Sequence, residues 1–390
     1  MTPDTAFDAL SRALTEEIPA AVQLRHELHA RPEVSGSETW TAARVAAALD
    51  EPDAAAVAGT GRLVRLGPPD GPSIAVRAEL DALPVRERTD APFSATGPAM
   101  HACGHDVHLA ALVALCRAAR RVGLPTGLLA VLQPREETHP SGAQDITAST
   151  ALAEHDVRAV VGVHVQPQLP LGTVAADPGV VNAGSDEFTL TVTGAGGHGG
   201  YPHLARDPVP ALCACVNVLQ QVLRGSVRPV QPAALSVGVL EAGQAANVIP
   251  DTARARGTLR TFSDADRKRL LDRLRAAAVG VAAAHDCRAT FDVDPIEPPL
   301  VNDPQLAMRT AEWLTRSGFA VGEIFRSCGS DDFAHYSTVA PSIMVFLGVG
   351  GEGVPMLHEP RFLPDDGRVY DVARAALAGY RAAVAYDAES

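Results

Sequence analysis

The chain has 390 residues and a formal net charge of −13, because 46 aspartates and glutamates outnumber 33 lysines and arginines. This length predicts two domains. An apolar share of 46% is enough for ordinary hydrophobic cores and excludes global disorder. The acidic balance argues against nucleic acid and membrane surfaces as partners, since their phosphates would repel the chain.

The lysine and cysteine content further narrows the possible classes of function and the cellular compartment. The single lysine, Lys268, lies in a charged run, so a Walker-type phosphate loop is excluded and pyridoxal chemistry is not expected. The N-terminus lacks the pattern of a signal peptide, and no apolar run approaches the ~18 residues of a membrane span. Six scattered cysteines fit reduced thiols, so we expect a cytoplasmic protein.

The first half of the chain predicts an α/β layer. Residues 4–50 have helical patterns, and Ser35 with Glu38 forms a capping-box pattern that would open a helix over 36–49. Three apolar runs follow as predicted buried strands, with an amphipathic helix over 105–122 between the first two. Strands that alternate with helices favour a mostly parallel sheet with helices on both faces. The predicted strands are 73–77, 128–132 and 160–165.

The pattern changes near residue 184, where apolar residues alternate with threonines as in a half-buried strand. From there the sequence predicts strand, helix, strand, strand, helix and strand, which is the ferredoxin-like βαββαβ plan. After about residue 297 the α/β pattern resumes, so a small domain is inserted between two parts of a larger one. The expected segments are 188–193, 207–224, 233–241, 252–261, 263–284 and 287–293 in the insert, then 304–316, 342–347 and 367–384.

The densest group of chemically active side chains is Met100–His108, which holds three histidines, a cysteine and an aspartate. Thiolate and imidazole ligands suit Zn²⁺ and other transition metals. A structural zinc site would need four protein ligands, usually with a second cysteine pair, which this sequence lacks. An open catalytic metal site is therefore favoured, and the alternative is a helix N-terminus with surface histidines.

Acidic residues follow two of the predicted strands. Glu136 and Glu137 come after the strand at 128–132, while Glu79 and Asp81 follow the strand at 73–77. Sites in open α/β sheets gather beyond the carboxyl ends of strands. One glutamate can therefore bind metal while its neighbour moves protons. Taken singly, each pair is also typical of a solvated turn.

Three further histidines stand alone. His164 interrupts an apolar strand, His358 lies in a late loop, and His198 lies in a glycine-rich loop of the insert. Singly, they are also typical of a hydrogen-bonded core histidine, a surface histidine and a flexible turn. The insert also offers an amide, Asn247, and a guanidinium, Arg260, which can grip a carboxylate.

Together these segments resemble the binuclear metal amidohydrolases and peptidases related to aminoacylases. The branch they resemble contains hippurate hydrolase, N-acyl-amino-acid amidohydrolases and auxin–amino-acid conjugate hydrolases. The motifs occur in the right order over almost the whole chain, at residues 24–33, 77–84, 100–106, 133–137, 162–164, 196–203, 247–251, 257–260, 332–333 and 357–358.

The resemblance implies a catalytic domain of residues 1–183 and 297–390, with residues 184–296 as an inserted lid or dimerisation domain. It implies two divalent metal ions, Mn²⁺ or Zn²⁺, with Co²⁺ and Ni²⁺ as alternatives, since a mixed sulfur, nitrogen and oxygen site accepts several metals. Carried over by position, the metal ligands are Cys103, His105, Glu137, His164 and His358, with Cys103 as a bridging thiolate.

The resemblance also implies roles in catalysis. Glu136 is the general base that takes a proton from the attacking water, and Asp81 falls on the acidic position beside the metals. His198 is similar to a lid histidine that stabilises the oxyanion, often across a dimer. Asn247 and Arg260 fall on lid positions that grip the carboxylate of the substrate.

The chain departs from the family pattern at several positions. Glu79 stands where aspartate is usual, which puts its contact with the metal shell in question. Arg135 stands where a small residue is common, and we expect it to add a cation near the base. Gly199 and Gly200 replace alanines beside His198 and suggest a looser lid.

The implied function is that of a metal-dependent hydrolase, which cleaves the amide bond of N-acyl amino acids as a homodimer joined through the lid. Two alternatives stay open at this point. One is a dipeptidase or carboxypeptidase on the same scaffold, and the other is a catalytically silent binding protein that kept the fold.

Overall fold

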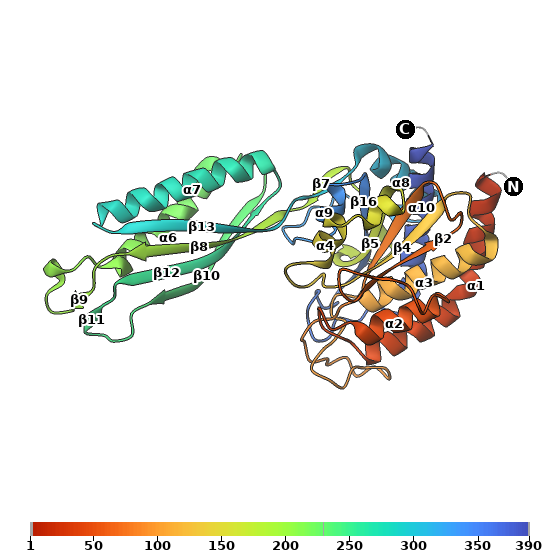
Figure 1. Cartoon of the computed structure of the whole chain (residues 1–390), viewed down its shortest axis with the longest axis horizontal. Coiled ribbons are helices and arrows are strands. Elements are labelled where there is room, and N and C mark those ends of the chain that lie inside the picture. Colours follow the sequence, from red (N-terminus) through yellow and green to blue (C-terminus); the bar gives the residue numbers. More distant parts are fainter. Residues whose placement is uncertain (1–2, 229, 389–390) are drawn as a thin grey trace. The chain divides into compact units, whose positions relative to one another are not determined.

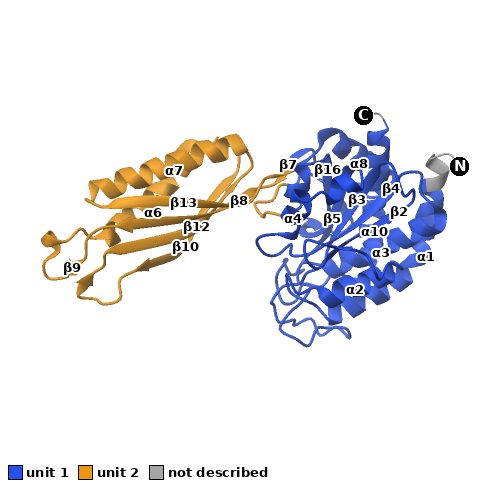
Figure 2. Cartoon of the chain, viewed as in Figure 1, with its two compact units in different colours: residues 1–179, 301–325, 332–390 blue, residues 180–300, 326–331 orange. Residues whose placement is uncertain are grey.

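A computed structural model describes residues 3–228 and 230–388, and the chain divides into two compact units (Figure 1, Figure 2). Each unit has its own hydrophobic core. Unit 2 interrupts the sequence of unit 1. Unit 1 comprises the described residues of Met1–Gly179, Val301–Phe325 and Asp332–Ser390, and unit 2 comprises those of Val180–Leu300 and Arg326–Asp331.

Unit 1 is built on a mixed sheet with the strand order β1-β2-β4-β3-β5-β16-β6-β15. Its central strands β4, β3, β5 and β16 run parallel. β3, β4 and β16 are buried along their whole length, as expected for strands covered on both faces. The predicted mostly parallel sheet is confirmed. The strands are β1 (Ala56–Val57), β2 (Gly61–Leu66), β3 (Ser73–Glu79), β4 (Gly127–Gln133), β5 (Val157–Pro170), β6 (Thr173–Ala175), β15 (Ala320–Val321) and β16 (Ser342–Gly350).

Helical segments cover both faces of this sheet. Gly379 packs so closely on Val161 of β5 that an added Cβ would lie 2.6 Å from the valine side chain. The next residue, Gly162, faces the other way and packs on Phe333. In the part of the chain that the structure describes, none of the helices is long and apolar enough to cross a bilayer. The helices of unit 1 are α1 (Pro3–Ala30), α2 (Thr39–Ala48), α3 (His105–Val122), α4 (Gly142–Ala148), α5 (Ala151–Glu154), α8 (Pro304–Arg316), α9 (Ala334–Ser337) and α10 (Gly367–Asp387).

Unit 2 has an antiparallel sheet of order β10-β12-β8-β13 and two long helices (Figure 2). Phe188, Leu190 and Val192 of β8 are buried, whereas the threonines between them are partly exposed. This alternation is the period of a strand with one covered face. Whether unit 2 acts as a lid or a dimerisation domain stays a prediction. Its elements are β8 (Gly184–Thr193), α6 (Pro208–Ser226), β10 (Ala233–Ala242), β12 (Thr252–Thr261), α7 (Asp264–Ala284) and β13 (Arg288–Glu297), with the short β7 (Gly179–Asn182), β9 (Gly197–His198), β11 (Val248–Ile249) and the 3-10 turn Pro202–Leu204. The short β14 (Leu300–Asn302) begins at the last residue of this part of unit 2 and continues into unit 1.

The segment before α2 differs from the predicted capping box over 36–49. Neither Ser35 nor Glu38 caps α2 with its side chain, because both have other partners, and Glu33 instead accepts from the backbone N–H of Thr41 at 2.8 Å. Ser35 Oγ donates to Asp81 Oδ2 at 2.6 Å, and Glu38 accepts from the backbone N–H of Arg135 at 2.9 Å. The capping prediction is wrong, and these bonds instead tie the segment to the acidic loops after β3 and β4.

Residues 326–331 belong to unit 2, although the sequence analysis assigns them to the second part of the catalytic domain. Ser327 explains the difference, because its backbone N–H donates to Val181 and its carbonyl accepts from Ala183. Ser330 accepts a hydrogen bond from Arg260 of β12. Hydrogen bonds to unit 2 therefore explain why this segment belongs to unit 2, although it is separated from the rest of that unit in the sequence.

A buried ion network fixes α1 against the start of α3. Arg25 Nε donates to Asp106 Oδ2 at 3.0 Å, and His29 Nδ1 lies 3.0 Å from the same oxygen. His29 Nε2 lies 3.1 Å from Glu87 Oε1, so both ring nitrogens face carboxylates. Burial by itself lowers the pKa of His29, but Asp106 and Glu87 outweigh this effect and raise that pKa to about 9. The imidazolium form therefore links the two elements at neutral pH.

We expect His29 to make the fold less stable at alkaline pH. Its pKa of about 9 in the folded chain exceeds the ~6.5 of an exposed histidine, so its contribution is complete below pH ~6.5 and is lost as the pH rises through 9. Between pH 6.5 and 10 the free energy of unfolding should fall by on the order of 3 kcal/mol more in the wild type than in His29→Gln. Urea unfolding at each pH measures this difference. His285→Gln, at an exposed histidine, should behave like the wild type, and an equal loss in both variants would contradict the assignment.

Candidate metal centre

The candidate site lies where the parallel strands of unit 1 end. β3 ends at Glu79 and β4 ends at Gln133, and each strand is followed by a loop with acidic residues. α3 begins at His105, directly after the Cys103 loop. Because neighbouring parallel strands end at the same edge, side chains from loops distant in sequence meet there.

Cys103, Glu137 and His358 form one group of potential ligands. Each offers a ligand atom within 4.8 Å of the others. His358 Nε2 lies 3.2 Å from Glu137 Oε1, and Cys103 Sγ lies 3.5 Å from His164 Nε2. The backbone N–H of His358 donates to Ala102 at 2.9 Å, which holds the late loop beside the cysteine.

His105, Glu136 and Glu137 form a second group with the same 4.8 Å spread. His105 Nε2 lies 3.8 Å from Glu136 Oε2. Glu137 belongs to both groups, so they are adjacent. The structure therefore brings together all five predicted metal ligands and the predicted general base, from loops up to 255 residues apart in sequence.

The side chains present fit divalent metal ions. The donors are a thiol, three imidazoles and carboxylates, which suit borderline transition metals. His105 Nδ1 donates to the carbonyl of Asp81 at 2.8 Å, which leaves Nε2 to face the cluster. That Nε2 is buried and makes no hydrogen bond to the residues that the structure describes. A buried polar atom without a partner is costly, and a cation would satisfy it.

The charge of the site also favours the binding of metal cations. Burial, and then the negative charges of Glu137, Glu136 and Glu79, raise the pKa of Cys103 well above its ordinary value. A thiol in these surroundings stays protonated unless a cation offsets the carboxylates. Burial likewise raises the pKa of Asp81, against the effect of nearby His105. The cluster is therefore suited to positive ions.

Asp81 bonds to two of the predicted ligands, Glu137 and His105. Its Oδ2 accepts from the backbone N–H of Glu137 at 2.9 Å and from Ser35. Its carbonyl accepts from His105. Asp81 therefore orients one ligand through the ring and another through the backbone.

Glu79, His108 and Arg77 form a buried group beside the predicted ligands, which we call the supporting layer. Glu79 accepts from His108 Nδ1 at 2.9 Å and from Arg77. His108 Nε2 in turn accepts from the backbone N–H of Val165 at 3.1 Å, directly after His164. Glu79 and His108 could also form a metal group with His105 and His164. However, Glu79 and His108 already bond to each other, Glu79 also bonds to Arg77, and His108 also bonds to the backbone of Val165. We therefore assign Glu79 to the supporting layer.

Arg77 extends this layer across the sheet. It donates to Gln133 Oε1 at 2.9 Å and to Asp332 Oδ1 at 2.6 Å. Tyr336 also donates to Gln133 at 3.0 Å. His108 and Gln133 belong to motifs singled out in the sequence but received no role there, although His108 lies one helical turn after His105 on the same helix face, a spacing that signals a shared role.

Arg135 does not lie where the sequence suggested. Its guanidinium donates to the carbonyls of Pro140 and Ala58 and pairs with Asp145. Its backbone has a positive φ of 52°, which turns this side chain toward α4. Asp145 of α4 therefore pairs with the charge of the Arg135 guanidinium.

The predicted lid residues all lie in unit 2, but at two places. β9 pairs with β11 so that Val248 lies opposite His198, and Gly199 N–H donates to Asn247 at 2.8 Å. His198 and Asn247 are therefore neighbours, and both are exposed. Arg260 lies near the opposite end of β12 from Thr252, which corresponds to roughly 26 Å along the strand. There it donates to Ser330 Oγ at 2.6 Å.

The chain has clear relatives. Residues 75–377 match Peptidase family M20/M25/M40. N-acetylcysteine deacetylase of Bacillus subtilis is 34% identical over 353 residues, which cover 88% of this chain and 92% of the relative. N-acetyldiaminopimelate deacetylase of Halalkalibacterium halodurans is 34% identical over 324 residues, covering 82% and 86%. A solved dinuclear metal-binding peptidase of the M20 family from Bacillus subtilis superposes with a TM-score of 0.82 at 30% identity, covering 95% of this chain and 99% of that one.

Removal of the thiol should reduce the number of metal ions bound. In Cys103→Ala we expect less Mn²⁺ or Zn²⁺ per chain after equilibrium dialysis, because the sulfur atom lies within 4.8 Å of donor atoms of Glu137 and His358 and 3.5 Å from His164 Nε2. Elemental analysis of the dialysed protein measures the ratio. Cys213→Ala, at an exposed cysteine, should bind as much metal as the wild type. Full metal content in Cys103→Ala would show that the cysteine is not a ligand.

The supporting layer should affect metal affinity. Glu79→Gln keeps the size of the side chain but cannot accept hydrogen bonds at both positions from His108 and Arg77. We expect the affinity for Zn²⁺ to fall about 10–100-fold, measured by competition with a chromogenic chelator. Glu312→Gln, at an exposed residue of α8, is the matched control. An unchanged affinity in Glu79→Gln would separate Glu79 from the metal centre.

Proposed function

The chain belongs to peptidase family M20/M25/M40 and is a hydrolase that acts on amide bonds, and we propose that it hydrolyses N-acyl amino acids with two bound divalent metal ions. The observation that carries this proposal is the cluster of thiol, imidazole and carboxylate donors around Cys103 and Glu137, with Glu136 beside it. Two relatives are named as deacetylases of N-acetylated amino acids, which supports this substrate class.

The proposed ligands are Cys103, His105, Glu137, His164 and His358. When bound there, divalent ions supply Lewis acidity for the amide carbonyl and for the attacking water. The side chain of His358 is 52% exposed, whereas that of His105 is 1% exposed. The His358 side is therefore the open side of the cluster, from which we expect a substrate to enter.

Glu136 is the proposed general base. Its Oε2 lies 3.8 Å from His105 Nε2, and its side chain is 11% exposed, so it borders the cluster and is still reachable. In the proposed reaction it accepts a proton as water attacks the carbonyl carbon. It then gives the proton to the nitrogen as the C–N bond breaks, which releases a carboxylic acid and an amino acid. Asp81 would position His105 and Glu137 rather than touch the substrate.

Unit 2 would supply the remaining groups. We assign His198 to the oxyanion and Asn247 and Arg260 to the carboxylate of the substrate. Within one chain, Arg260 is separated from the other two by most of β12, so a substrate of amino-acid size cannot touch both ends. This separation supports a homodimer, in which the two ends come from different subunits.

The metal and the compartment are proposed on chemical grounds. A mixed donor set accepts Mn²⁺ or Zn²⁺, and also Co²⁺ or Ni²⁺. All six cysteines are free thiols, which supports a reducing compartment and hence a cytoplasmic enzyme.

A substrate panel tests the function. We expect amino-acid release from N-acetyl, N-benzoyl or indole-acyl amino acids by purified protein with Mn²⁺ or Zn²⁺, and none after chelation. Plain dipeptides in the same panel test the peptidase alternative. Release from dipeptides alone would replace the proposed activity by a peptidase. A metal-loaded protein that cleaves nothing in the panel would favour a silent binding protein.

Glu136→Gln tests the base on whichever substrate the panel identifies. We expect kcat to fall by about 10²–10⁴ because an amide side chain cannot accept the proton, whereas the metal content should stay at the wild-type value. Glu352→Gln, at an exposed residue, should keep full activity. A Glu136→Gln enzyme with normal turnover would assign the base to another residue.

A further inference from the structure

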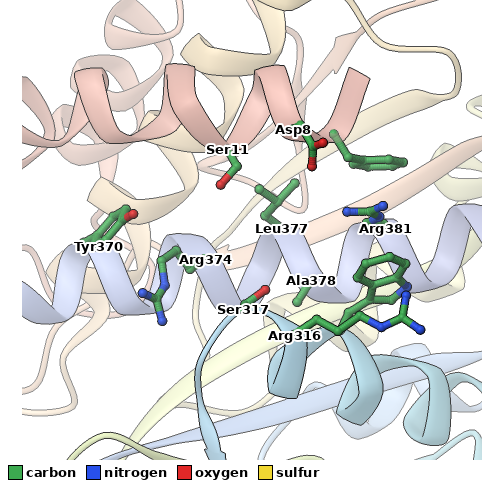
Figure 3. A pocket seen from close by; sticks show the side chains of 11 residues that line it. Asp8, Ser11, Arg316, Ser317, Tyr370, Arg374, Leu377, Ala378 and Arg381 are labelled. Carbon is green, nitrogen blue, oxygen red and sulfur yellow. The ribbon is translucent and has the colours of Figure 1, made fainter. Parts of the chain in front are cut away.

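A cavity of unit 1 lies between α1, α8 and α10, and none of the proposed metal-site residues lines it (Figure 3). Its volume is about 550 Å³, within the ~300–1,000 Å³ of small-molecule sites. Asp8 and Ser11 come from α1, while Arg374 and Arg381 come from α10 (Figure 3). Arg316 and Ser317 come from the end of α8.

The lining of this cavity is positively charged. Three guanidinium groups, Arg316, Arg374 and Arg381, face it with a single carboxylate, that of Asp8. The chain as a whole has a net charge of −13, so this is a local reversal of sign. Such a concave positive surface attracts anions.

Aromatic rings hold these guanidinium groups in place. The Cζ of Arg381 lies 3.4 Å from the centroid of Trp313, and that of Arg316 lies 4.5 Å from the same ring. The Cζ of Arg374 lies 4.3 Å from Phe319 and 5.1 Å from Tyr370. In Arg316 and Arg374, stacking occupies the face of the guanidinium group and leaves its in-plane N–H donors to bind other groups.

One of these donors lacks an acceptor. Arg374 Nε is buried and makes no hydrogen bond to residues 3–228 or 230–388. A buried donor without an acceptor is costly, and oxygen atoms of a carboxylate or phosphate match the fork of donors that arginine presents. We propose that this cavity binds a small molecule through a phosphate or carboxylate group, held by Arg316 and Arg374.

Calorimetric titration of the metal-loaded full chain tests this site. The probes are inorganic phosphate and succinate, each at constant ionic strength in chloride, since added salt would screen the interaction. We expect saturable binding of one anion per chain by at least one probe. Binding of phosphate alone identifies a phosphate ligand, and binding of succinate alone identifies a carboxylate ligand.

Variants assign the binding to this cavity rather than to the metals. Arg316→Gln and Arg374→Gln should each weaken binding by about tenfold or more, because each removes charge-assisted hydrogen bonds. Arg12→Gln, at an exposed arginine of α1 outside the cavity, should change it by less than about twofold. If Arg374→Gln does not fold, Arg316→Gln decides, since Arg316 is exposed. Absence of saturable binding, or binding that both cavity variants leave unchanged, would overturn the proposal.

Discussion

Buried negative charge at the carboxyl edge of the central sheet is the constraint on which the site depends. Glu79, Asp81 and Glu137 lie there with the Cys103 thiol, all largely removed from water. Carboxylates in such a place are stable only when cations or donors surround them. Arg77 and His108 provide this for Glu79, whereas Glu137 and Cys103 face one another and the histidines. The chain thus neutralises Glu79 with its own side chains, whereas the negative charge around Glu137 and Cys103 is left for bound cations to neutralise.

The same constraint explains why the surrounding structure is so strongly tied together. Asp81 accepts from Ser35 and Glu137 and through its carbonyl from His105, which joins three loops at one residue. On the far side of His105, Asp106 binds Arg25 and His29 of α1. A metal ligand holds its geometry only when its own partners are fixed, and the contacts of Asp81 fix the proposed ligands His105 and Glu137.

Much of this could be predicted from the sequence, and the exceptions share a cause. The apolar runs of β3, β4 and β16 identify buried parallel strands because their whole length is apolar. The density of histidine and cysteine near Cys103 identifies a metal cluster because few other uses need those residues together. Ser35 and Arg135 were misread, since their partners Asp81 and Asp145 meet them only in the folded chain. Asp332 is 255 residues from Arg77, and local patterns carry no information about such a bond.

The interruption of unit 1 by unit 2 also determines the order in which the protein can be completed during synthesis. β16 lies between β5 and β6 in the sheet, although it follows both of them in the chain by more than a hundred residues. His358 comes later still. Because domains fold as units during synthesis from the N-terminus, unit 2 can form its own core while the large sheet still lacks a central strand. The central sheet of unit 1 and the proposed set of metal ligands are therefore completed only when the last part of the chain has been synthesised.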